Sequence, residues 1–233
     1  MSLASSHLRS RTRFGAGLLL ATLMCAPVGA HEYRPFGRHS GRDDAAVLAH
    51  CPRAGDARWP PARMLNALKR RMRTPTARDI DPHVTLAAML APGDDTHRWS
   101  DQRGAVIVGY VAAVRVGGVE SVNCHTHEAR YRDTHIEMTL EPLHDSPSRR
   151  VIVEVTPQWR ERLARQGIDW STPALRRALL GRWVRVTGWL LFDFEHENAA
   201  ANTATDPDAR IWRATAWEIH PVTRITVLRG RRH

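Results

Sequence analysis

The chain has 233 residues and a formal net charge of +10, and this length suits one folded domain with an appended segment. No apolar run approaches the roughly 20 residues that a membrane-spanning helix needs. The basic residues are all arginine except Lys69 and are interleaved with acids, so the positive charge alone does not indicate a polyanionic partner.

The first thirty residues have the pattern of an export signal. Arginines between residues 9 and 13 precede an apolar stretch over 14–24, and Val28-Gly29-Ala30 supplies small residues for cleavage before His31. Removing residues 1–30 lowers the formal charge from +10 to +7, because the segment contains three arginines and no acid. We therefore predict an exported protein, periplasmic or extracellular.

Cleavage leaves two cysteines, Cys51 and Cys124. Outside the cytoplasm two cysteines can pair, and a disulfide that closes so long a loop stabilises a fold by roughly 4 kcal/mol in the chain-entropy model. The alternative is a thiolate metal ligand at Cys124 with Cys51 free. We favour the disulfide.

The segment 31–103 is predicted to be a lead-in and a helical arm. Residues 31–60 are rich in Gly, Pro, Arg and His and show no apolar periodicity. Apolar residues at helical spacing then predict an amphipathic helix over 62–73, with Arg70 and Arg71 facing outward.

From residue 104 the pattern changes to strands, and the region 104–233 is predicted to form a mainly β domain. Alternating and β-branched runs predict five strands, with two helical stretches between the third and the fourth. The strands are expected over 105–116, 133–141, 151–155, 183–192 and 212–220, and the helices over 159–165 and 171–180. This order is that of an OB-like, five-stranded Greek-key barrel. Its strand order, 1-2-3-5-4, makes strands 2, 3 and 5 neighbours.

That adjacency gathers ionisable side chains that are far apart in the sequence. Small cores rarely carry so many of them, because burying an unpaired charge costs several kcal/mol. We expect them to share one outward, solvated barrel face as a ligand site. The candidate site residues are Asp133, His135, Glu154, Asp193, His196, Arg213, Glu218 and His220.

Several interpretations of this set stay open. A divalent metal such as zinc is one, with His135, His196 and His220 as its ligands. Acid–base catalysis is another, because imidazole–carboxylate pairs can transfer protons near neutral pH. A third is purely structural, in which cross-strand pairs hold the sheet face together. Trp189 and Trp217 are then core residues.

Nucleic acid is a fourth class of partner. Arginine and tryptophan alternate over 182–189, as in nucleic-acid-binding grooves. The acidic character of the strand 2-3-5 face would repel phosphates, so we do not expect a nucleic-acid partner.

Five motifs resemble a family of uncharacterised exported bacterial proteins with an OB-like barrel. They are Glu120-Ser-Val-Asn-Cys-His125, Asp133-Thr-His135, Val153-Glu-Val-Thr-Pro157, Gly188-Trp-Leu-Leu-Phe-Asp193 and Trp217-Glu-Ile-His-Pro221. The resemblance implies the same fold and an exported location. It implies no particular activity, because that family is uncharacterised. Val122 stands where that family often has a second cysteine, which weakens a thiolate metal site in this loop.

The function predicted from the sequence is an exported OB-like binding module with a carboxylate and imidazole site, whose ligand is a small molecule, a metal or an anion. Arg213 is a candidate anion clamp. The alternative is a metal-dependent hydrolase that uses the same residues, with Glu154 or Glu218 as the base.

Overall fold

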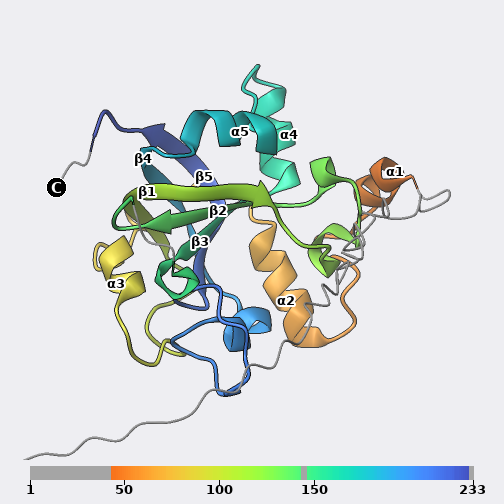
Figure 1. Ribbon diagram of the computed structural model, residues 1–233. Coiled ribbons are helices and arrows are strands. Elements are labelled where there is room, and N and C mark those ends of the chain that lie inside the picture. Colours follow the sequence, from red (N-terminus) through yellow and green to blue (C-terminus); the bar gives the residue numbers. More distant parts are fainter. Residues whose placement is uncertain (1–42, 143–145, 231–233) are drawn as a thin grey trace, which may run out of the picture. The chain divides into compact units, whose positions relative to one another are not determined.

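The computed structural model describes residues 43–142 and 146–230 (Figure 1). The export signal predicted over residues 1–30, and the start of the lead-in up to residue 42, lie outside these described residues. Within the described part, no helix is both long and apolar enough to cross a membrane.

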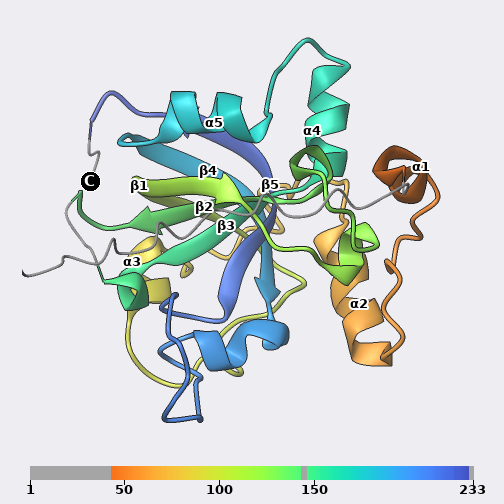
Figure 2. The same ribbon diagram turned by 45° about the vertical axis from the view of Figure 1, so that its right-hand side comes forward.

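Five strands close into a mixed barrel with the hydrogen-bonded order β1-β2-β3-β5-β4 (Figures 1 and 2). Their bounds are Gly104–Val116 for β1, Thr134–Thr139 for β2, Val151–Val155 for β3, Trp183–Phe192 for β4 and Trp217–Val227 for β5. β3 pairs with β5 in parallel, and the other neighbouring pairs are antiparallel. The mainly β, five-stranded barrel predicted from the sequence is confirmed, and β3 lies between β2 and β5.

The barrel core is built from one face of each strand. Ile136 of β2 is in register with Val153 of β3, which is in register with Ile219 of β5. All three side chains are fully buried in the hydrophobic core, together with the indole of Trp217. Because successive strand residues point to opposite faces, the residues next to this row face away from the core.

Helices and short turns connect the strands. The α-helices are α1 (Asp44–Ala49), α2 (Pro60–Lys69), α3 (Leu86–Leu90), α4 (Pro157–Ala164) and α5 (Thr172–Leu179). The 3₁₀ turns are η1 (Ser121–Asn123), η2 (Ala129–Tyr131), η3 (Pro147–Arg149) and η4 (Phe194–Ala199). Ser171 caps α5, since its hydroxyl accepts a hydrogen bond from the Ala174 amide.

Helix α2 ends earlier than predicted, and one of its flanking arginines is not on the surface. The helix stops at Lys69, although the apolar spacing predicted that it would continue to residue 73. The guanidinium of Arg71 donates to the carbonyls of Asp101 at 2.6 Å and Leu190 at 2.8 Å. The prediction that Arg71 faces outward is therefore wrong, because this side chain holds the chain after α2 against β4.

Strand β5 also begins later than predicted. The sequence predicts a strand from residue 212, whereas β5 starts at Trp217. Residues 213 and 214 instead join other segments: Arg213 forms an isolated bridge with Ala200, and the Ala214 amide donates to the carbonyl of Arg150 at 2.8 Å.

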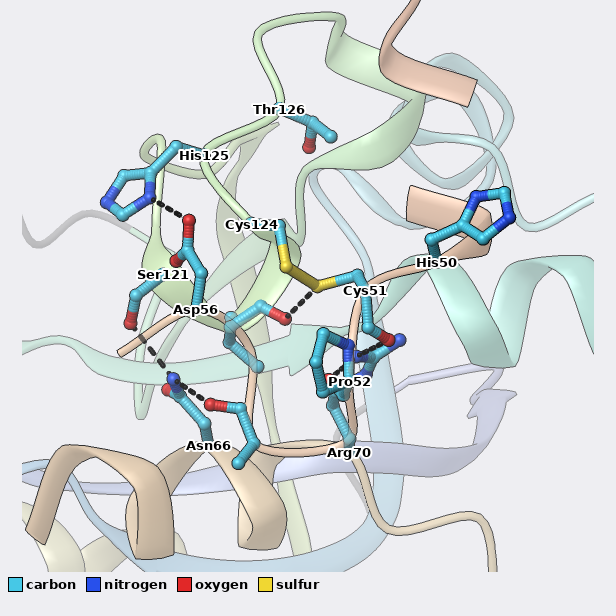
Figure 3. The surroundings of a disulfide bond; sticks show 12 residues. His50, Cys51, Pro52, Asp56, Asn66, Arg70, Ser121, Cys124, His125 and Thr126 are labelled. Atoms are coloured by element: carbon cyan, nitrogen blue, oxygen red, sulfur yellow. Dashed lines mark hydrogen bonds and ion pairs between the residues drawn. A yellow bond between two sulfur atoms is a disulfide. The ribbon is translucent and has the colours of Figure 1, made fainter. Parts of the chain in front are cut away.

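A disulfide joins the segment after α1 to the loop that follows β1 (Figure 3). Cys51 and Cys124 are bonded with a Cα–Cα distance of 5.9 Å. The predicted disulfide is confirmed, and Cys124 is therefore not a free thiolate ligand.

Helix α2 fixes the same loop from its other side. The Asn66 amide nitrogen donates to the carbonyl of Ala54 at 3.0 Å and to the hydroxyl of Ser121 at 2.9 Å (Figure 3). Gly55 has a φ of +60°, and a Cβ there would lie 2.0 Å from the Ser121 carbonyl oxygen. The segment before α2 and η1 are thus packed backbone to backbone, which fixes the position of Glu120 and Asn123.

Candidate functional site

The strand register brings the predicted site residues together on the barrel face opposite the core. His135 of β2 is the register partner of Glu154 of β3. Glu218 and His220 flank Ile219, which pairs with the residue before Glu154. Side chains from three neighbouring strands therefore meet at Glu154, as the strand order predicts.

The contacts between these side chains are close. His135 Nε2 lies 2.6 Å from Glu154 Oε1, and His220 Nδ1 lies 3.5 Å from Glu154 Oε2. His220 Nδ1 also donates a hydrogen bond to Glu218 Oε1 at 2.9 Å. On the other side of the ring, His220 Nε2 lies 3.4 Å from Asp133 Oδ2.

This face is not solvated, in contrast to the prediction. Glu218 and His220 are 0% exposed, and Asp133 and Glu154 are 2% exposed. The face is covered because α2 packs against β5 and η1, and the arm thereby places its last residue, Lys69, over the cluster. The cluster is a buried site rather than a shallow surface pocket.

Asp193 and His196 form the second part of the cluster, at the end of β4. Asp193 Oδ2 accepts a hydrogen bond from His196 Nδ1 at 2.9 Å and lies 3.1 Å from Lys69 Nζ. The rings of His135 and His196 both contact Trp212, with centroid distances of 6.3 Å and 5.4 Å. Asp193 and His196 are therefore connected to the rest of the site through Lys69 and Trp212.

Arg213 is part of the cluster but is not open to an external anion. Its side chain is fully buried and donates to Glu218 Oε2 at 2.8 Å and to the Thr215 carbonyl at 2.8 Å. The role of anion clamp predicted for Arg213 does not fit this geometry, because its charge is already paired with Glu218.

Three site residues were not identified from the sequence: Lys69, Glu120 and Asn123. Lys69 Nζ lies 3.0 Å from Glu120 Oε2, and the Asn123 amide donates to Asp133 Oδ1 at 3.1 Å. Two signals could have found them. Lys69 is the only lysine in the sequence, whose other basic side chains of this kind are all arginine. Glu120 and Asn123 lie in one of the five motifs.

Burial and mutual charge shift the ionisation of the cations in this cluster. Burial alone would lower the pKa of Lys69, but the carboxylates of Asp193 and Glu120 outweigh it and hold that pKa well above its usual value. Burial likewise opposes protonation of His135, yet the charge of Glu154 raises its pKa to about 9. The pKa of His220 is also raised, because Glu154 and Glu218 overcome its burial.

The pKa values of the carboxyl groups are shifted in opposite directions. Burial raises the pKa of Asp133 to about 6, although His220 opposes that rise. Burial also disfavours the charged forms of Glu154 and Asp193, but cations overcome it and lower both pKa values, through His135 and His220 at Glu154 and through Lys69 at Asp193.

Two groups of donor atoms are close enough to hold a metal ion. Among the described residues, Asp133, Glu154 and His220 form one group, and Glu120, His135 and Glu154 form the other, each with donor atoms within 4.8 Å of one another. The three-histidine set predicted from the sequence is not among them, since each group contains a single imidazole.

Several of the donor atoms have no hydrogen-bond partner. Asp133 Oδ2, Glu154 Oε2 and His220 Nε2 are buried atoms for which the described structure provides none. Buried polar atoms are nearly always paired in folded proteins, because an unpaired one costs about 1–3 kcal/mol. With the described residues these atoms make only long ion-pair contacts, 3.4 Å between His220 Nε2 and Asp133 Oδ2 and 3.5 Å between His220 Nδ1 and Glu154 Oε2, which is the most unusual feature of the cluster.

Comparison with protein-family models finds no match for this chain, and comparison with curated proteins finds none either.

Proposed function

We propose that the protein is a binding module whose buried cluster holds one divalent metal ion between Asp133, Glu154 and His220. The observation that carries this proposal is that Asp133, Glu154 and His220, from three separate segments, offer donor atoms within 4.8 Å of one another. Each of the three residues also has a buried polar atom without a hydrogen-bond partner among the described residues. Imidazole and carboxylate together suit zinc and manganese, so zinc is the first ion to test.

The donor spacing supports this assignment. His220 Nε2 and Asp133 Oδ2 are 3.4 Å apart. Two ligands of a tetrahedral zinc ion with bonds of about 2.1 Å are separated by about 3.4 Å. The distance between these two atoms therefore matches the distance between two ligands of one ion.

The surroundings of His220 also match those of a metal ligand. Histidines that bind metals usually donate their other ring N–H to a carboxylate, which fixes the ring and its tautomer. His220 Nδ1 donates in this way to Glu218, which is itself held by Arg213. This hydrogen bond leaves Nε2, which lies 3.4 Å from Asp133 Oδ2, as the ring nitrogen that can bind an ion.

The burial of these ligands favours binding over the hydrolase alternative. None of the three is more than 2% exposed, so a bulky substrate has no path to an ion held there. The ion would compensate the buried carboxylates in place of the imidazole protons that do so in the metal-free cluster.

The strand order, with α4 and α5 between β3 and β4, supports an OB-like Greek-key assignment for the barrel. The disulfide and the basic, apolar pattern of residues 1–30 support an exported protein. We also propose membership of the family of exported proteins that the five motifs resemble.

Calorimetric titration of tag-free protein stripped with EDTA tests the proposed function. We expect Zn²⁺ to bind the full chain and to raise its thermal unfolding temperature, and we expect His220→Gln to weaken binding by about 100-fold or more. Glu137→Gln is the matched control, because Glu137 is a buried β2 carboxylate that pairs with Arg115 and Arg150 outside the cluster. Absence of binding heat and of a thermal shift with both Zn²⁺ and Mn²⁺ would overturn the proposal.

A further inference from the structure

Glu154 belongs to both groups of donor atoms, and this sharing is the starting point of a further inference. Its strand, β3, lies between the strands of the two imidazoles. Its Oε1 lies 2.6 Å from His135 Nε2 and its Oε2 lies 3.5 Å from His220 Nδ1. The Glu154 carboxylate thus directs one oxygen toward His135 and the other toward His220.

The second group consists of Glu120, His135 and Glu154. His135 Nε2 forms an ion pair with Glu154 Oε1 and has no other polar partner among the described residues. Gly117 makes room for this ring, since a Cβ there would lie 3.0 Å from His135 Cδ2. The imidazole is therefore positioned by the backbone of the loop with its Nε2 atom directed into the cluster.

The two groups differ in their access to solvent. The side chains of Glu120 and His135 are 18% and 12% exposed, whereas that of His220 is 0% exposed. Metal sites that are closed to solvent are typically structural, and sites that keep an open position bind water or a ligand. The second group has the character of an outer, open position.

The carboxylates of the cluster could balance more than one divalent ion once the imidazoles have lost their protons. The permanent cations of the cluster are Lys69 and Arg213, both buried. The carboxylates around them number six, namely Glu120, Asp133, Glu154, Asp193, Glu195 and Glu218. Imidazoles that bind metal are neutral. In the metal-bound state the balance of these groups is therefore −4, which two divalent ions would neutralise.

From these observations we infer that the cluster is a two-metal centre in which Glu154 bridges the ions. The inner ion is held by Asp133 and His220 and the outer ion by Glu120 and His135, with water completing the outer coordination. Ions that share a bridging carboxylate lie about 3.5–4 Å apart. This inference rests on the proposed function for the inner ion and adds an exchangeable second ion to it.

The full-length chain, stripped of metal and dialysed against MnCl₂, tests this inference by elemental analysis and electron paramagnetic resonance. We expect two Mn²⁺ ions per chain and a spectrum of exchange-coupled ions, since the ions are close. His135→Gln should retain one ion with the spectrum of an isolated Mn²⁺, and Glu137→Gln should retain both.

Glu120→Gln gives a second test in case His135→Gln does not fold, because Glu120 lies in a loop and is partly exposed. It should also reduce the content to one ion. One ion in the wild type, with no change in either variant, would overturn the second position and leave the proposed function standing. No ion in the wild type would overturn both.

Discussion

Nδ1 of His220 lies 2.9 Å from Oε1 of Glu218, and the other oxygen of that carboxylate accepts a hydrogen bond from Arg213 at 2.8 Å. This arrangement fixes the imidazole from behind, so that its Nε2 atom faces Asp133 at 3.4 Å. A ring held in this way needs no reorientation to bind a cation, and its supporting carboxylate can be tested separately from the ligands.

The first prediction concerns that support. Glu218→Gln keeps every proposed ligand but weakens the hydrogen bond that orients His220. Loss of such a partner typically lowers metal affinity by roughly 10- to 100-fold. Calorimetric titration with Zn²⁺ should show this decrease, whereas Glu137→Gln should bind Zn²⁺ as the wild type does. Equal affinities of Glu218→Gln and wild type would show that Glu218 does not orient a ligand.

The second prediction concerns Lys69, which lies between Asp193 and Glu120. Lys69→Met leaves these carboxylates without their cation, and breaking a buried ion pair from one side costs roughly 3–5 kcal/mol. We expect a decrease of this size in the free energy of unfolding, measured with urea.

Asp193→Asn in the Lys69→Met background supplies the control, because it removes one uncompensated charge. We expect it to restore part of the lost stability. A loss below about 1 kcal/mol for Lys69→Met would mean that the lysine is not needed to balance these carboxylates.

How much of this site the sequence predicts depends on the kind of contact. The strand pattern predicts His135, Glu154 and His220 on the face opposite the core, and the strand order predicts that Glu154 lies between the two histidines. These relationships are local or follow from the sheet, so they were predictable.

The depth of the site was not predictable, because it depends on tertiary docking. Nothing in the periodicity of α2 shows that the helix packs against β5 and places Lys69 over the cluster, so the sequence predicts only a helical arm. For the same reason Glu120 was missed, since its position depends on the Asn66 contact and the disulfide. Arg213 was misread because the sequence does not show that Glu218 already pairs with it.

The third prediction concerns pH. The folded-state pKa of His135 is raised to about 9 by Glu154, which overcomes the effect of burial, while an unfolded histidine titrates near 6.5. Protonated His135 therefore stabilises the metal-free fold fully below pH of about 6.5, and this contribution is lost as the pH rises through about 9.

Urea unfolding of EDTA-treated protein at these two pH values measures that contribution. We expect up to about 3 kcal/mol less stability at the higher pH. His135→Gln should remove most of the difference. If the stability of His135→Gln decreased by the same amount between these pH values, the pH dependence would come from another titratable group.

The fourth prediction concerns the disulfide. Cys51 and Cys124 are 73 residues apart, and opening a loop of this length costs roughly 4 kcal/mol in the chain-entropy model. The double variant Cys51→Ala, Cys124→Ala should lose about that much stability. Amide hydrogen exchange should also accelerate over residues 117–132 more than in β3, because the loop loses its covalent attachment to the segment after α1. Equal acceleration in the loop and in β3 would contradict this local role.

Anomalous X-ray scattering from crystals grown with Zn²⁺ tests the central claim most directly. The account predicts a peak at the zinc edge about 2.0–2.2 Å from Asp133, Glu154 and His220. A refined structure without such a peak, in which Asp133 and His220 are joined by a direct hydrogen bond, would contradict it.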